Sequence, residues 1–251
     1  MSEYSELIKI GVLKGQYPSV LYKYYRLNQN FINTLEGWYL WFDSFDNYND
    51  PYEGKCNVQT KYTNDEIIEW IRKIGGVRPS NKAALSLFLH DFPEILKDKI
   101  NNAAKETKVC CFSKKNDDLL MWAHYADSYR GICVEFDTIK LAESLSLLLL
   151  PVKYEKKYPT VDYLHHPQDT INQMVLTKAD VWGYEKEYRF IVPYCSTNKI
   201  SFDSRALKSI VVGCQCDKKS EFYHQMLSIL PSWVSVHDSE VYETSYRLMI
   251  K

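Results

Sequence analysis

Short stretches of the chain either alternate hydrophobic with polar residues or concentrate aromatic and β-branched ones, and both patterns predict β-strands. We expect strands at residues 20–26, 38–43, 108–113, 131–137, 148–154, 187–192, 200–202, 207–212 and 241–249. Apolar residues spaced three to four apart predict helices instead, at residues 31–35, 119–126, 140–147, 171–179 and 218–230.

A longer helical pattern covers about residues 64–107, where Ile67, Ile68 and Ile71 begin the series. Strands connected both by short turns and by helices are typical of α+β proteins. The sequence therefore predicts a single α+β domain over residues 1–251, with a mixed, largely antiparallel sheet, flanking helices and a helical insertion at about 64–107.

The charge balance argues against a protein that binds nucleic acid through gross charge. The 31 Lys and Arg residues against 32 Asp and Glu leave a formal charge of -1, although a local basic site is compatible with it. The start of the chain has no basic leader, and its apolar runs are far shorter than the ~20 residues that cross a bilayer. We expect a cytoplasmic protein with no membrane partner.

The chain lacks several motifs that identify common enzyme classes. It has seven cysteines but no paired CxxC, so we expect incidental thiols and no metal site. It has no Gly-rich phosphate loop, HExxH or GxSxG motif, which weighs against P-loop ATPases, zincins and α/β-hydrolases. A Rossmann-type dinucleotide site is unsupported as well.

The segment WGYEKEYRFIV, residues 182–192, carries the most informative polar cluster. In a regular strand, Glu185, Glu187 and Arg189 point to one face and the apolar side chains to the other. One interpretation is a solvated strand face with a cross-strand ion pair. The other is a site in which one carboxylate contacts a polar substrate group or a developing cation while Arg189 holds its neighbour.

A second cluster lies in the block CFSKKNDDLLMWAHYADSYRG, residues 111–131. Ser113 ends the strand at 108–113, and the helix at 119–126 carries Trp122, His124 and Tyr125. A histidine among aromatic residues is typical of a hydrogen-bonded core. The same group is also suited to stacking on a flat ring.

The opening strand and the turn after it offer further polar groups. Lys23 and Arg26 lie on opposite faces of a regular strand, so only one of them is expected to enter a given cleft. In the turn NDPYE, Asp50 and Glu53 can bind a hydroxyl group or a cation, or can simply stabilise the turn.

These segments resemble a bacterial family, the domain of unknown function numbered 2971. The similar elements are LYKYYR, NDPYE, CFS with LMWAHYADSYRGICVEF, WGYEKEYRFIV and the late IVVG, in that order over about residues 21–213. The family name supplies no reaction.

The same order of elements also resembles, more distantly, the ADP-ribosyltransferases, which use NAD without a Rossmann fold. That resemblance implies catalytic roles for Glu187 and, upstream, Glu185. It implies NAD binding by Lys23 or Arg26 and by Ser113. The acceptor, whether protein, nucleic acid, small molecule or water, stays open.

The resemblance and these clusters leave three functions open, of which the resemblance implies the first. The first is an NAD-dependent ADP-ribosyltransferase-like enzyme or NAD glycohydrolase, in which Trp122, His124, Tyr125 and Arg189 help to hold the nucleotide. The second is a non-catalytic nucleotide-binding or protein-interaction module. The third is a metal-dependent nuclease that uses Asp50, Glu53, Glu185 and Glu187, although these acids have no recognised spacing.

Overall fold

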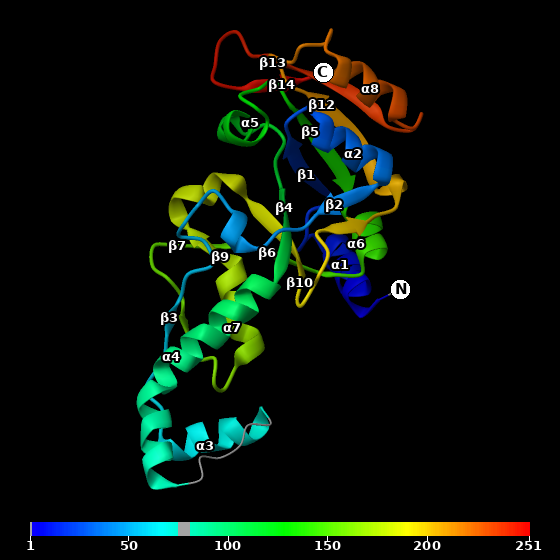
Figure 1. Ribbon diagram of the computed structural model, residues 1–251. Helices are drawn as coiled ribbons and strands as arrows, with labels where there is room; N and C mark the ends of the chain where they lie inside the picture. Colours follow the sequence, from blue (N-terminus) through cyan, green and yellow to red (C-terminus); the bar gives the residue numbers. More distant parts are fainter. Residues whose placement is uncertain (1, 75–80) are drawn as a thin grey trace. The chain divides into compact units, whose positions relative to one another are not determined.

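The chain divides into two compact units in the computed structural model, which describes residues 2–74 and 81–251 (Figure 1). Unit 1 comprises Met1–Asp43, Lys108–Val152 and Val181–Lys251. Unit 2 comprises Ser44–Thr107 and Lys153–Asp180. The predicted helical insertion at 64–107 therefore falls in unit 2, together with a second segment that comes much later in the chain.

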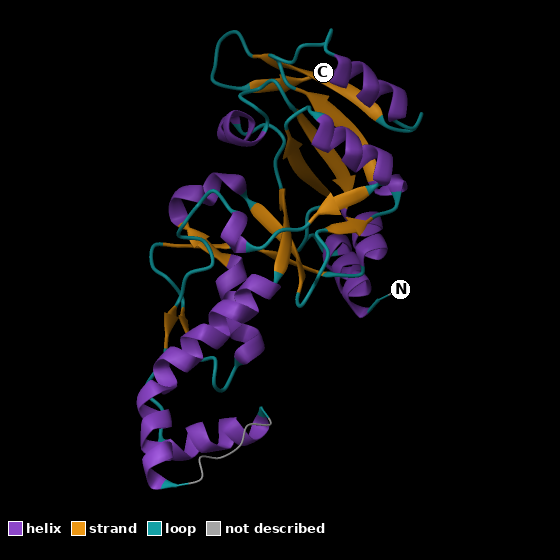
Figure 2. Ribbon diagram, in the orientation of Figure 1, coloured by secondary structure: helices purple, strands orange, loops and turns teal. Residues whose placement is uncertain are grey.

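Unit 1 is built on an eight-stranded sheet with the order β14-β13-β12-β5-β1-β4-β10-β6 (Figure 2). Its strands are β1 Val20–Tyr25, β4 Lys108–Ser113, β5 Ile132–Asp137, β6 Leu148–Pro151, β10 Glu187–Val192, β12 Leu207–Val212, β13 Ser235–Val241 and β14 Leu248–Ile250. Within this sheet, every described pair of strands is antiparallel except β12 with β13. The prediction of an α+β fold with a largely antiparallel sheet is thus confirmed.

Helices cover one face of this sheet, and a small two-stranded sheet joins them. The helices are α1 Glu3–Leu13, α2 Gln29–Gly37, α6 Thr138–Leu145 and α8 Glu221–Ile229, and the small sheet pairs β2 Tyr39–Trp41 with β11 Lys199–Ser201. The side chain of Asn28 accepts a hydrogen bond from the backbone N–H of Phe31 and so caps α2. This cap fixes where the chain turns from β1 into the helix.

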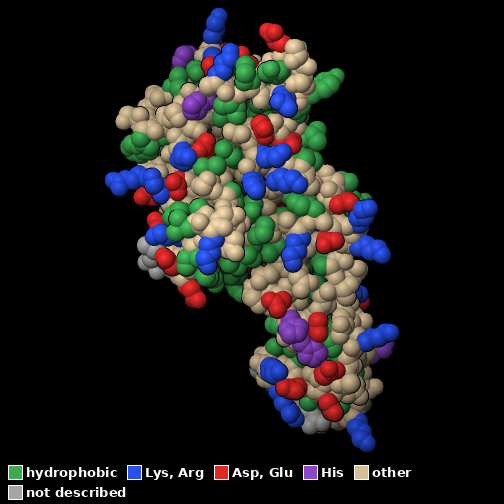
Figure 3. Space-filling model, turned by 180° about the vertical axis from the view of Figure 1, so that it is seen from behind, with side chains coloured by type: hydrophobic (Ala, Val, Ile, Leu, Met, Phe, Trp, Pro, Cys, Tyr) green, Lys and Arg blue, Asp and Glu red, His purple; other side chains and the backbone are tan. Residues whose placement is uncertain are grey.

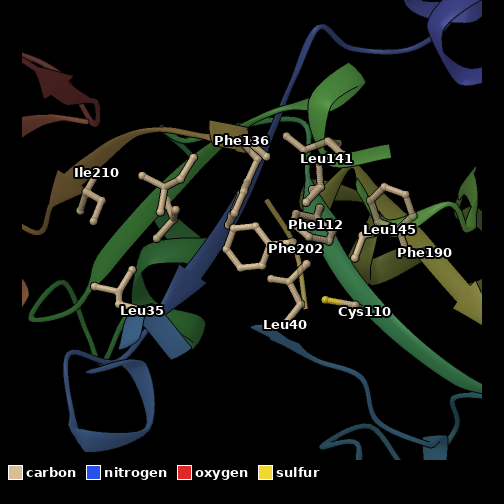
Figure 4. Close-up of a cluster of buried hydrophobic side chains, with 14 of the residues drawn as sticks. Leu35, Leu40, Cys110, Phe112, Phe136, Leu141, Leu145, Phe190, Phe202 and Ile210 are labelled. Atoms are coloured by element: carbon tan, nitrogen blue, oxygen red, sulfur yellow. The ribbon is translucent and has the colours of Figure 1, made fainter. Parts of the chain in front are cut away.

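The main core of unit 1 lies between these helices and the sheet (Figure 4). Strand alternation places Phe112, Phe136 and Phe190 on the same face, and all three are buried. The ring of Phe112 packs edge-on against Phe136 and Phe190, with centroids 5.6 and 5.7 Å apart. Burial of large aromatic rings is a major source of folding free energy, so this cluster fixes the face of β4 and β10 that points inward.

The opposite face of the sheet carries α5 Leu119–Tyr125, which begins at the capping residue Asp118. Trp122 on this helix is completely buried and packs edge-on against Tyr24 of β1, with ring centroids 5.4 Å apart. The short helix therefore anchors a second, smaller core and places its C-terminal end, with His124 and Tyr125, beside the segment that leads into β10.

Unit 2 is mainly helical, with α3 Asn64–Lys73, α4 Lys82–Glu106 and α7 Pro167–Leu176. Two short parallel pairs complete it, β3 Asn57–Val58 with β8 Thr160–Val161, and β7 Lys153–Glu155 with β9 Thr177–Ala179. Thr63 and Glu66 form a reciprocal capping box at the start of α3. No helix among the described residues combines the length and the hydropathy needed to span a bilayer.

Two predicted strands differ from the structure. The strand expected at 241–249 is wrong, because β13 ends at Val241 and β14 begins only at Leu248, with a turn closed by the bond from the Tyr242 N–H to the Arg247 carbonyl. The strand expected at 148–154 is divided at Val152 into β6 and β7.

On the face shown in Figure 3, basic and acidic side chains are interspersed, in keeping with the near-zero net charge.

Candidate functional site

Ser113 and Glu187 lie directly opposite each other on the neighbouring strands β4 and β10. Tyr22 of β1 lies opposite Ser113 on its other side, so the three side chains form a row across the sheet. Residues opposite each other in an antiparallel pair project from the same face. This face is the one away from the phenylalanine cluster, and both Ser113 and Glu187 are buried on it.

Glu187 is held by Arg189, two residues along the same strand. The Arg189 Nε donates to Glu187 Oε1 at 2.8 Å, and its Nη2 donates to Oε2 at 3.0 Å. Side-chain exposure is 0% for Arg189 and 5% for Glu187. A buried charge pair is tolerated when good hydrogen-bond geometry offsets the cost of removing both groups from water. An ion pair is therefore present on this strand face, but it lies within one strand and is buried, whereas the first interpretation predicted a solvated cross-strand pair.

Glu185 lies next to Ser113, but it is not part of the strand in which alternation placed it. Its segment is the 3-10 helix η2 Asp180–Glu185, and Lys186 has a positive φ of 47°, so the expected strand does not include it. The side chain of Glu185 is nevertheless buried and accepts a hydrogen bond of 2.7 Å from the Tyr125 hydroxyl. The Ser113 hydroxyl donates to the backbone carbonyl of Glu185 at 2.6 Å.

These contacts bring five of the predicted site residues together, Arg189 among them. Ser113 ends β4, Glu185 ends η2, Glu187 begins β10 and Tyr125 ends α5. Buried ionisable groups that cluster in this way are a feature of functional sites, although structural networks share it. We refer to Ser113, Tyr125, Glu185, Glu187 and Arg189 as the carboxylate cluster.

An aromatic group borders the carboxylate cluster. The Nδ1 atom of the exposed His124 lies 3.0 Å from the Tyr184 hydroxyl, and the ring of Trp182 lies 6.3 Å from the His124 ring. Sequence reasoning did not single out Trp182 and Tyr184 as site residues. The available signal was their position, since Trp182 and Tyr184 come directly before the acidic residues Glu185 and Glu187.

Trp122 is not placed for the stacking role predicted for it. Its side chain is fully enclosed, and its Nε1 donates to the backbone carbonyl of Asn116 at 2.7 Å. Its indole ring also lies parallel to the Tyr129 ring, with centroids 6.4 Å apart. These contacts make it part of the smaller core, because helix packing turned this face of α5 inward.

Of the two candidate basic residues, Lys23 does not join the carboxylate cluster. Lys23 pairs with Val134 of the main core, so it projects from the face opposite to Ser113 and Glu187. Its Nζ donates to the backbone carbonyl of Cys111 at 2.9 Å. Arg26 is exposed and follows the end of β1. The expected convergence of one of them with Ser113 and Glu187 is therefore not found for Lys23.

Tyr22 completes the row beside Ser113 and has an altered acidity. Burial, with the nearby Glu135 carboxylate as a second cause, raises the pKa of Tyr22 to about 12. The phenol therefore stays protonated on this face well above neutral pH and can act as a hydrogen-bond donor.

Two of the four acids proposed for a nuclease, Asp50 and Glu53, lie in unit 2 and have local partners there. Asp50 Oδ1 accepts from the backbone N–H of Tyr52 at 2.9 Å, as an Asx turn requires. The buried Glu53 lies 3.6 Å from the Nζ of Lys178. Within the described residues, no group of three or more His, Cys, Asp or Glu side chains is arranged to hold a metal ion.

Comparison with known families gives one match. Residues 121–190 match the family model described as "Protein of unknown function (DUF2971)". The matched segment contains Tyr125, Glu185, Glu187 and Arg189, four members of the carboxylate cluster. No curated protein and no solved structure matches the chain.

Proposed function

We propose that unit 1 acts on NAD as an ADP-ribosyltransferase-like enzyme or an NAD glycohydrolase. The observation that supports this best is the alignment of Ser113 with Glu187 on adjacent strands, with Glu185 bonded to both Ser113 and Tyr125. Ser113 and Tyr125, both far away in the sequence, thus contact the short segment that carries the two carboxylates. Such paired acids suit the cleavage of a glycosidic bond.

The reaction develops positive charge on the ribose as nicotinamide leaves, and an anion held in a site that excludes water stabilises that charge strongly. In the proposal Glu187 is this anion, and the Arg189 fork positions it and keeps it ionised. Glu185 receives the proton of the attacking group. The aromatic group of His124, Trp182 and Tyr184 stacks on a flat ring of the nucleotide.

A second candidate is a non-catalytic nucleotide-binding or interaction module. The Glu187–Arg189 pair favours this candidate. Both oxygens of the Glu187 carboxylate accept hydrogen bonds from one guanidinium, an arrangement that suits a structural role. In this case the Tyr125–Glu185 bond joins α5 to the segment before β10 and serves stability alone.

The deciding experiment incubates the full chain with NAD, measures binding by calorimetry and quantifies released nicotinamide by chromatography. We expect Glu185→Gln to lower the rate of release about 100-fold or more while the protein melts near the wild-type temperature. Glu240→Gln is the matched control, because Glu240 pairs with Lys251 on the exposed surface of unit 1.

Glu187 needs a different design, because Glu187→Gln alone takes away the carboxylate to which the fully buried Arg189 donates two hydrogen bonds. The double variant Glu187→Gln/Arg189→Met removes both charges and is also expected to be inactive. If wild-type protein neither binds NAD nor releases nicotinamide, the enzymatic proposal fails and the module replaces it. Release unchanged in both variants would show that the carboxylate cluster is not the site.

A further inference from the structure

A cavity of ≈ 380 Å³ in unit 2 is lined by two loops of similar composition. The first loop, residues 51–56, contributes Tyr52 and Lys55. The second, residues 156–159, connects β7 to β8 and has the sequence Lys-Lys-Tyr-Pro. Each loop therefore brings one tyrosine and at least one lysine to the same cavity, whose volume is in the range that holds a nucleotide.

The lysines of this cavity give it a net positive charge. Lys55, Lys156 and Lys157 are exposed, and no described carboxylate lies within 4.0 Å of any of them. Glu155 is the one acidic residue among the side chains that line the cavity. Such a surface attracts phosphate groups. A lysine that has no ion pair within the protein has no such pair to break when it contacts a phosphate, and the contact releases counterions from the nucleic acid.

The two tyrosines are available for stacking. Tyr52 is 66% exposed and Tyr158 is 42% exposed. Neither ring packs against another aromatic ring in the part of the chain that the structure describes. Tyrosine presents a flat apolar face with little rotamer freedom to lose, which makes it an effective platform for a nucleobase.

Buried contacts hold both loops in place. Asp50 fixes the start of the first loop through the Tyr52 N–H, and the buried pair of Glu53 with Lys178 ties the loop to β9. The Asn57 N–H donates to the carbonyl of Pro159 at 2.8 Å and so links the first loop to the end of the second. The positions of the tyrosines and lysines are therefore set by the fold of unit 2.

A larger cavity of ≈ 760 Å³ continues beyond the first and shares Lys55 and Asn57 with it. Tyr48, Lys97 and Asn101 line it, together with the acidic residues Asp50 and Glu53. The two cavities together therefore offer more room than a single nucleotide needs. From this combination we infer that unit 2 binds single-stranded nucleic acid, with bases stacked on Tyr52 and Tyr158 and phosphates at Lys55, Lys156 and Lys157.

The test titrates the full chain into a fluorescently labelled single strand of about ten nucleotides and follows anisotropy at several salt concentrations. Three phosphate contacts predict that the logarithm of the association constant falls with the logarithm of salt with a slope of about −2. Lys156→Ala/Lys157→Ala should reduce the size of this slope by about 1.4. The matched control is Lys218→Ala/Lys219→Ala, an adjacent lysine pair in unit 1, which should leave the slope unchanged.

Stacking is tested at Tyr158. Tyr158→Ala should weaken binding by about 5-fold to 150-fold, whereas Tyr158→Phe keeps the ring and should bind like wild type. Circular dichroism of each variant establishes that unit 2 stays folded.

Three results would overturn the inference: equal binding of a duplex of the same length, displacement of the strand by a free mononucleotide at equal affinity, or an unchanged slope in the unit 2 lysine variant. The inference does not rest on the proposed NAD chemistry. Nicotinamide release measured in the same Lys and Tyr variants separates failure of one from failure of the other.

Discussion

Replacing Arg189 by methionine should be among the most damaging single substitutions in unit 1. Methionine fills much of the same space but removes both donors that Arg189 directs at the Glu187 carboxylate. The carboxylate then stays 5% exposed without its guanidinium partner. A buried charge that loses its partner cannot recover the hydration it gave up on folding, so the folded state rises in free energy.

The expected loss is about 3–5 kcal/mol of unfolding free energy, the usual cost of breaking a buried ion pair from one side. With a urea dependence of about 2 kcal/mol per molar, the midpoint should fall by about 2 M. The double variant Glu187→Gln/Arg189→Met removes both charges. It should lose only about 1–3 kcal/mol, because an imperfectly bonded buried amide costs less than a buried ion.

The assay is urea unfolding of wild type, both variants and a surface control, followed by tryptophan fluorescence. The control is Lys208→Met, since Lys208 pairs with Glu135 at 2.9 Å but has a side chain that is 45% exposed. It should cost at most about 1 kcal/mol. An Arg189→Met protein as stable as this control, or a double variant no more stable than Arg189→Met, would refute the assignment of this pair as a strong buried interaction.

Two further predictions concern unit 1. Because the folded-state pKa of Tyr22 is about 12 against an ordinary value of 10.0, its contribution to stability is complete below pH 10 and is lost as the pH rises toward 12. Tyr22→Phe should flatten this alkaline decline by about 1 kcal/mol, measured by urea unfolding between pH 9 and about 12, with partial exposure limiting the effect. Gly131→Ala should cost more than about 3 kcal/mol, because a Cβ there meets the backbone oxygen of Tyr25. Gly15→Ala, where the space is open and φ is +72°, should cost only about 1 kcal/mol, and equal melting temperatures of the two variants would contradict this difference.

Local pattern was enough to predict several elements of unit 1. The strands at 108–113, 187–192 and 207–212 match β4, β10 and β12 at both ends. Each has β-branched or aromatic residues on a buried face, so its own sequence favours the extended state. The same alternation predicted that Glu187 and Arg189 share a face, because side chains two residues apart in a strand always do.

Elements with a weak local signal were missed. Helix α1 is absent from the predicted elements although its cap, Ser2, accepts a hydrogen bond from the Ser5 N–H. Strand β13 has the sequence Ser-Val-His-Asp-Ser-Glu-Val and buries only Ser239. Its extended conformation comes from pairing with β12 and β14, so no hydrophobic alternation marks it.

The sequence by itself determined the fold class, the main strands and the presence of an acidic pair beside an arginine. Tertiary structure decided which of these groups meet. Strand register places Ser113 opposite Glu187. The positive φ of Lys186 ends the extended conformation, so Glu185 lies outside β10. Lys23 projects from the core face of the sheet, where its Nζ lies 5.3 Å from the centre of the Phe112 ring. Register and the choice of inward face depend on contacts between segments far apart in the chain, and no local pattern contains them.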